Sequence, residues 1–122
     1  MNADMLAGKV VEHMMQHDLF SQWLGIQVLE VREGYSRITM KVRKEMVNGF
    51  GIAHGGIAFS LADSAFAFAC NNRNNLSVAL DTSINFTKQV MVGDTLTAEA
   101  KELHNGRSRS EEHTSELQSP CN

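Results

Sequence analysis

The pattern of apolar and polar residues divides the chain into a short series of elements. Asp4 to Phe20 carries apolar residues at helical spacing with polar residues between them, which predicts an amphipathic helix. Gly25 then marks a bend. Ile26 to Arg32 is a predicted strand, and Tyr35 to Val42 alternates cleanly between apolar and polar positions. The short link Glu33-Gly34 joins the two strands, so a hairpin is expected.

A longer segment, His54 to Cys70, is apolar almost throughout and is broken by a single carboxylate at Asp63. Its Ala, Leu and Phe residues favour a helix over a strand, and a helix of this length is roughly 25 Å long. A helix that is apolar on nearly every side must be buried on nearly every side. We therefore expect a sheet to wrap around it, or a partner to cover what the sheet leaves. The polar run Asn71 to Asn75 ends the segment.

Two further strands are predicted over Ser77 to Phe86 and Thr95 to Leu103, with Gly93-Asp94 as the turn between them. His104-Asn105-Gly106 is a hairpin turn signal, after which another strand should follow. Antiparallel strands packed on one long helix make the predicted fold class α+β.

From Arg109 onward the sequence loses its periodicity. Arg109 to Ser119 looks like the in-frame translation of a common short-read sequencing adapter, and a natural polar tail is the alternative. Segments of that origin take no part in a fold. We therefore predict one domain over residues 1–108, truncated at its C-terminus, and a non-native, adapter-derived tail over residues 109–122.

Composition limits the kind of protein and its partners. The chain has 122 residues, so it forms at most one small domain. A net charge of −3 gives no basic signature, so no nucleic acid partner is expected. No run reaches the ~18 apolar residues that span a bilayer, and the N-terminus lacks the layout of a signal peptide. Cys70 and Cys121 make no disulfide framework, which favours a cytoplasmic setting. His13, His17 and His104 lack the spacing of metal ligands.

The start of the central helix offers a candidate oxyanion site. Gly55 and Gly56 lie where backbone N–H groups have no partner within a helix. A ligand oxygen can approach glycine closely, and the helix dipole adds positive potential there. The alternative is that the two glycines only permit a tight turn from loop to helix.

Three side chains near this point are candidates for chemistry. Asp63 lies in apolar surroundings that should raise its pKa, which suits a general base or a nucleophile. Alternatively, it faces solvent on a stripe that it shares with Ser60, Ser64 and Ala67. Asn48 could hydrogen-bond an acyl oxygen or the attacking water, or could simply form a turn with Gly49. His54 could orient a substrate, although a histidine at a helix start is more often structural.

Spacing along the helix decides how these groups could cooperate. Gly55 and Asp63 are eight residues apart, which is about 12 Å along a helix axis. One small carbonyl group cannot easily be served by both residues of the same chain. If they act together, the acid comes from a second subunit across a two-fold interface. The catalytic interpretation therefore predicts a dimer.

The stretch from Asn48 through His54-Gly55-Gly56 to the helix residues around Asp63 resembles the hotdog-fold acyl-CoA thioesterases, most closely the branch of phenylacetic acid degradation. The similarity continues into Phe86 and the Gly93-Asp94 turn. The resemblance implies an antiparallel sheet wrapped around a long central helix, in homodimers or homotetramers with sites at the dimer interface. It implies hydrolysis of an acyl-CoA, with hydroxyphenylacetyl-CoA or a related aryl-acyl-CoA as the candidate substrate, without a cofactor.

The family motif implies catalytic roles for Asn48, His54 and Gly55 of one subunit and Asp63 of the neighbour. Lys88 and Arg107 are candidates for contacting the phosphates of CoA. Two rival functions stay open: a non-catalytic acyl-CoA-binding hotdog module, and a hotdog hydratase or dehydratase. The chain departs from the family after the His104-Asn105-Gly106 turn, where members usually have two more strands.

Overall fold

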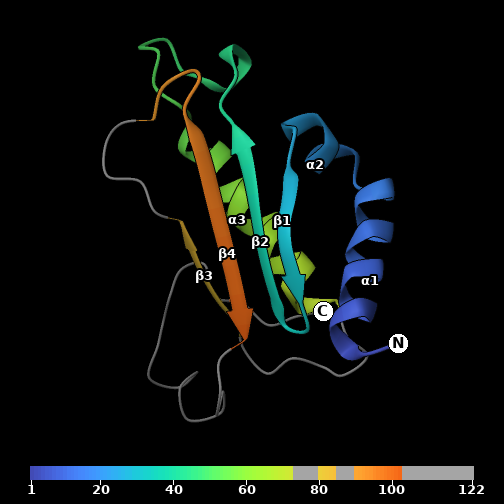
Figure 1. Ribbon diagram of the computed structural model, residues 1–122. Helices are drawn as coiled ribbons and strands as arrows, with labels where there is room; N and C mark the ends of the chain where they lie inside the picture. The colour runs from blue at the N-terminus through green and yellow to red at the C-terminus, as the bar shows by residue number, and fades with distance from the viewer. Residues whose placement is uncertain (73–79, 85–89, 103–122) are drawn as a thin grey trace.

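The fold of the chain was analysed in a computed structural model, which describes residues 1–72, 80–84 and 90–102 (Figure 1). The described part contains three α-helices, one short 3₁₀ helix and four strands. In chain order these are α1 (Ala3–His17), α2 (Leu19–Leu24), β1 (Gln27–Arg32), β2 (Tyr35–Lys41), η1 (Lys44–Met46), α3 (Gly55–Cys70), β3 (Leu80–Ile84) and β4 (Thr95–Glu102).

The strands form one antiparallel sheet in the order β1-β2-β4-β3. Helix α3 packs across one face of this sheet, and α1 lies beside β1 (Figure 1). The expected alternation in the hairpin is confirmed, because Ile38 and Met40 of β2 are buried, as is Val42 just after it. Leu96 and Ala98 of β4 are buried in the same core. The α+β class expected from the sequence is therefore confirmed.

The N-terminal helix predicted over Asp4 to Phe20 is two helices, because Asp18 interrupts it. The Asp18 carboxylate accepts hydrogen bonds from the backbone N–H of Ser21 at 3.0 Å and from the Ser21 hydroxyl at 2.6 Å. A carboxylate at an N-cap satisfies free N–H groups and starts a new helix. Gly25 ends α2 with a φ of 76°, so the predicted bend is confirmed.

The other strand predictions hold to within a residue or two where the structure describes them. Gly34, with a φ of 73°, lies in the turn between β1 and β2. Of the strand predicted over residues 77–86, β3 covers the described part. The predicted turn at residues 104–106, the strand expected after it and the tail from Arg109 lie outside the described residues.

Helix α3 matches the predicted central helix, with His54 as its N-cap. The sheet covers much of it, and Leu61, Ala65 and Phe68 are fully buried. The opposite side is open, because Phe59 is 55% exposed and Asp63 is also exposed. The chain itself therefore leaves one stripe of α3 uncovered.

The end of α3 differs from the expectation for the cysteines. Cys70 is buried there and is disulfide-bonded, whereas the sequence predicted no disulfide framework. Cys121 lies outside the described residues. Within the described part of the chain, no helix is both long and apolar enough to cross a bilayer.

Candidate functional site

The loop before α3 is organised by Asn48. Its side-chain Oδ1 accepts hydrogen bonds from the backbone N–H groups of Phe50, at 2.9 Å, and Ile52, at 3.1 Å. Its backbone N–H donates to the Ile52 carbonyl at 2.8 Å, and Gly51 takes a φ of 78°. Asn48 is therefore a turn residue, which was one of the two alternatives that the sequence left open. Within the described residues the Nδ2 group makes no hydrogen bond, so it remains available as a donor.

His54 joins this loop to the helix through its backbone. Its N–H donates to the carbonyl of Met46 at 2.9 Å, and its carbonyl accepts from the N–H of Ile57 at 3.0 Å. The preceding residue, Ala53, is fixed by a hydrogen bond of 2.7 Å to the Val90 carbonyl. The imidazole is exposed and makes no capping hydrogen bond. The structural role of His54 thus uses its backbone and leaves its ring accessible.

Gly55 and Gly56 are the first residues of α3, and their exposed N–H groups meet no acceptor within the part of the chain that the structure describes. A Cβ atom at either position would meet nothing within 4 Å. Neither residue takes a positive φ. Neither the packing of the single chain nor a left-handed backbone therefore demands glycine here. That weakens the alternative that the glycines only permit a tight turn. Close approach of a ligand or of a second chain is the explanation that remains for glycine at these positions.

Asp63 lies farther along the same uninterrupted helix. It is exposed, so its own chain does not supply the burial that the sequence predicted. The exposed stripe of α3 runs from Gly55 and Gly56 through Phe59 to Asp63, at the spacing of one helix face. The separation of Gly55 and Asp63 along α3 stays about 12 Å. One chain therefore does not bring the donor and the acid together.

The neighbouring serine of α3 has a structural role. Ser64 is buried, and its hydroxyl lies 2.8 Å from that of Ser21 in α2. The single hydroxyl hydrogen of Ser21 goes to Asp18, so Ser64 is the donor in this contact. Ser64 thus anchors α2 to α3. It does not share the open stripe with Asp63, where the sequence had placed it.

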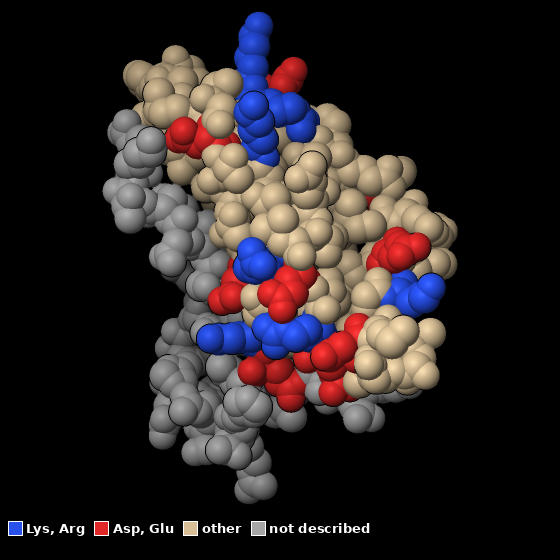
Figure 2. All heavy atoms as spheres, viewed as in Figure 1, with Lys and Arg blue, Asp and Glu red and all other residues tan. Residues whose placement is uncertain are grey.

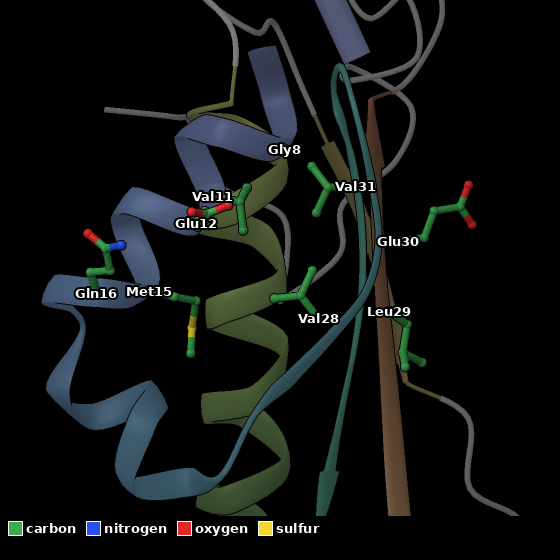
Figure 3. A pocket seen from close by; sticks show the side chains of 9 residues that line it. All are labelled: Gly8, Val11, Glu12, Met15, Gln16, Val28, Leu29, Glu30 and Val31. Carbon is green, nitrogen blue, oxygen red and sulfur yellow. The ribbon is translucent and has the colours of Figure 1, made fainter. Parts of the chain in front are cut away.

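A hollow among the described residues lies away from the start of α3. A cavity of about 590 Å³ opens between α1 and β1, with Val11, Met15 and Val28 pointing into it (Figure 3). Gly8 also lines it. None of the predicted catalytic residues lines this cavity. The cavity therefore does not coincide with the predicted site.

Charge on the sheet is concentrated on the face opposite α3, where basic and acidic side chains interleave (Figure 2). Burial, together with a hydrogen bond to Glu99, raises the pKa of Tyr35. The hydrogen bond from Arg32 is the main cause that lowers the pKa of Glu30. No group of three or more potential ligands for a metal ion is found among the described residues. Lys88 and Arg107 lie outside them.

Comparison with known proteins identifies the family. Residues 50–111 match the Thioesterase superfamily. The chain belongs to this superfamily. It is 43% identical over 94 residues to the acyl-coenzyme A thioesterase PaaI of Escherichia coli, and this match covers 77% of the chain and 67% of the relative.

Solved structures of relatives have the same fold. The E. coli PaaI structure, from the phenylacetic acid degradation operon, superposes with a TM-score of 0.68 at 28% identity, covering 84% of this chain and 97% of that one. The smu.793 protein of Streptococcus mutans, bound to acetyl CoA, gives a TM-score of 0.54 at 30% identity, covering 67% and 66%. The predicted hotdog fold is thereby confirmed. The chain spans only 64% and 67% of the length of the first curated relatives that it matches.

Proposed function

We propose that the protein is an acyl-CoA thioesterase, which hydrolyses an acyl-CoA to the free acid and CoA. The observation that carries this proposal is the pair of exposed N–H groups at Gly55 and Gly56, at positions where the chain itself does not require glycine. Such donors at a helix start suit a carbonyl oxygen that gains negative charge. The E. coli relative is named for this activity, and the S. mutans structure holds acetyl CoA.

In the proposed mechanism, the Gly55 N–H polarises the thioester carbonyl and stabilises the oxyanion formed on attack. Loss of one such donor typically costs ~10²–10³ in rate. The Nδ2 group of Asn48 offers a second donor to the acyl oxygen or to water, because its Oδ1 is held by the loop. The exposed imidazole of His54 helps to orient the substrate. Asp63 takes a proton from the water that attacks the carbonyl, or it attacks the carbonyl directly and forms an anhydride that water then hydrolyses. In both routes the C–S bond breaks and CoA leaves as the thiolate.

The proposal requires two copies of the chain. The stripe with Phe59 and Asp63 is exposed in one chain, and an apolar face on a central helix needs a cover. A second copy packed against this stripe would bring its own Asp63 toward the Gly55 of the first. It would also surround Asp63 with apolar groups, as the sequence predicted. A homodimer, alone or within a homotetramer, is therefore the proposed functional unit.

Release of free thiol from acyl-CoA tests this function. We expect release by the whole chain, and a loss of about 100-fold or more in Asp63→Asn, because the amide cannot accept a proton or attack. Glu33→Gln is the matched control, since Glu33 is an exposed acid in the turn between β1 and β2. Equal rates in Asp63→Asn and the unchanged protein would refute the role of Asp63.

A second candidate is a module that binds acyl-CoA without hydrolysing it. The exposure of Asp63 in the single chain favours it, because an exposed carboxylate needs no catalytic use to be tolerated. Saturable binding of CoA without thiol release from any acyl-CoA of a broad panel would support this module. A hydratase or dehydratase would instead act on an unsaturated or hydroxylated acyl chain and leave the thioester intact.

The substrate class, the cellular compartment and the C-terminal boundary of the domain are also proposals. A substrate of the aryl-acyl class, such as hydroxyphenylacetyl-CoA, is tested by including phenylacetyl-CoA and straight-chain acyl-CoA in the same assay. A cytoplasmic setting is proposed from the sequence. The boundary at residue 108 is tested by sequencing the 3′ end of the gene from an independent source.

A further inference from the structure

A cluster of two aromatic rings and one guanidinium group lies where α2 meets the end of the hairpin. The rings of Phe20 and Trp23 are stacked, with centroids 6.1 Å apart and an angle of 11° between their planes. The guanidinium carbon of Arg43 lies 4.8 Å from the centroid of Trp23. We call these three residues the α2 platform. Phe20 and Trp23 are 52% and 50% exposed, so much of their ring surface is open to a ligand.

Positive charge borders the platform. Lys41 and Lys44 are exposed on either side of Arg43 in sequence, and Figure 2 shows Lys and Arg side chains gathered at the end of the molecule where η1 lies. Two acids lie nearby. The carbonyl of Asp94 accepts the N–H of Val42, the residue before Arg43, and Glu45 Oε1 lies 3.7 Å from Arg43 Nε with its side chain 66% exposed. A contact of this kind at the surface is weak. An incoming anion can therefore compete with Glu45 for Arg43.

The α2 platform is near the start of α3. Arg43 is the N-cap of η1 and Met46 is its last residue, so their Cα atoms can be at most ~11 Å apart. Met46 accepts the backbone hydrogen bond of His54, which precedes Gly55. The backbone N–H of Arg43 in turn donates to Met46 Sδ at 3.4 Å. A single short turn thus separates the platform from the proposed oxyanion donors.

We propose that the α2 platform binds the nucleotide end of CoA. The adenine base stacks on Trp23 and Phe20, and Arg43 and Lys44 bind the phosphate groups. Base stacking on aromatic side chains stabilises nucleotide complexes, and Arg pairs well with phosphate. An uncharged apolar partner would gain nothing from the bordering cations. A free phosphate would gain nothing from the rings. This inference rests on the proposed function, because it takes an acyl-CoA as the ligand.

The chain has one tryptophan, so intrinsic fluorescence reports directly on the α2 platform. We expect saturable quenching of Trp23 by CoA and by adenosine 3′,5′-bisphosphate, and none by pantetheine, which lacks the nucleotide. Binding of CoA in calorimetry without a change in Trp23 fluorescence would overturn the proposal. Equal quenching by pantetheine would also overturn it.

Variants of opposite sign separate binding from a structural role. Arg43→Gln should weaken binding of the bisphosphate by about tenfold, the effect of losing ~1.4 kcal/mol. Glu45→Gln should tighten binding severalfold, because it removes the competing carboxylate. Lys9→Gln, a matched change on exposed α1, should leave affinity unchanged. Weaker binding in Glu45→Gln, or an equal loss in Lys9→Gln, would contradict recognition of phosphate at Arg43.

Kinetics with a truncated substrate distinguishes this inference from the proposed function. For acyl-CoA, Arg43→Gln should raise KM more than it lowers kcat. For the matching acyl-pantetheine thioester, KM should be the same with and without the substitution. Hydrolysis that responds equally to Arg43→Gln with both substrates would refute the nucleotide site and keep the thioesterase. An absence of hydrolysis together with normal quenching by CoA would refute the thioesterase and keep the site.

Discussion

Tyr35 is the single tyrosine of the chain, and it bridges β2 and β4. Its hydroxyl donates to Glu99 Oε2 at 2.5 Å, and the guanidinium group of Arg32 lies 3.9 Å from its ring centroid. Burial is the main cause that raises the Tyr35 pKa, and the hydrogen bond to Glu99 adds to it. Deprotonation would place two negative oxygens side by side. The folded protein therefore holds the phenol protonated.

Titration of phenolate absorbance should show a Tyr35 pKa above the ordinary value of about 10. Because the folded pKa lies above the unfolded one, this stabilisation is complete below pH ~10 and is lost as pH rises through the folded pKa. Glu99→Gln should lower the Tyr35 pKa by removing the adjacent charge. Glu33→Gln, a remote change, should leave it unaltered. An ordinary pKa in the folded protein would contradict the contact with Glu99.

Asn72 fixes the turn between β1 and β2 to the end of α3. It is fully buried, its Oδ1 accepts from the N–H of Gly34 at 2.9 Å, and its Nδ2 donates to the Arg32 carbonyl at 2.8 Å. The sequence predicts Asn72 only as part of a polar run, because five polar residues in a row give no sign of which one is buried. The position of the hairpin against α3 determines which of these residues is buried.

Asn72→Ala should lower the free energy of unfolding by about 2–4 kcal/mol, because it leaves buried backbone groups without partners. Asn71→Ala is the matched control, since within the described part of the chain the exposed Asn71 side chain bonds only to Ala67 of its own helix. It should cost less than about 1 kcal/mol. Urea unfolding of both variants measures the difference. Equal losses would show that Asn72 does not join the hairpin to the helix.

At the scale of elements, the periodicity of the sequence predicted the strands that have one buried face. The hairpin and β4 were correctly placed because burial of one face imposes a period of two residues on their sequences. Helix α3 was correctly placed because its Ala, Leu and Phe residues favour a helix. The break at Asp18 was missed, since the apolar spacing continues across it and only the capping geometry stops the helix. The uncovered stripe of α3 was foreseen in outline. The residues that line this stripe were not all foreseen, because the Ser64 side chain turns inward to meet Ser21.

The start of α3 gives a prediction that separates stability from function. Gly55→Ala adds a methyl group where nothing lies within 4 Å and where φ is not positive. It should raise the free energy of unfolding by about 0.4–1 kcal/mol, because the unfolded chain loses freedom. It should also slow thiol release by about 10- to 100-fold, because the methyl group displaces the thioester. Urea unfolding and thiol release measure the two effects.

Gly8→Ala is the matched control for that experiment. Gly8 lies within α1, and a Cβ atom there would also meet nothing within 4 Å. It should raise stability by a similar amount and leave thiol release unchanged. If Gly55→Ala is as active as Gly8→Ala, close approach of the substrate to the start of α3 is not needed. If it is less stable than the unchanged protein, the space at Gly55 is filled by a second chain.

At the scale of the whole molecule, the candidate site extends beyond one chain. The sequence could predict the donor, the acid and their separation, because all three follow from positions along one helix. It could not predict that Asp63 would be exposed, since exposure depends on which side of α3 the sheet leaves open. Exposure and separation together point to a second copy as the missing part of the site.

Mixing two inactive variants tests this arrangement. Gly55→Val blocks the donor end and Asp63→Asn removes the acid, so each variant alone should release almost no thiol. In a mixed dimer, the intact Gly55 of one subunit meets the intact Asp63 of the other, and one of its two sites is restored. With random association half of the dimers are mixed. We therefore expect about a quarter of the unmodified activity after the two variants are unfolded and refolded together.

The control is the same two variants refolded separately and then combined just before the assay, which should stay inactive until subunits exchange. Differently tagged subunits, captured through one tag, would show that mixed dimers have formed. If mixed dimers form without recovering activity, Gly55 and Asp63 do not serve one site from two subunits. The 12 Å separation along α3 would then have to be bridged within one chain. That would require α3 to bend or unwind between its first turn and Asp63, and the Asp63→Asn variant alone could not have shown it.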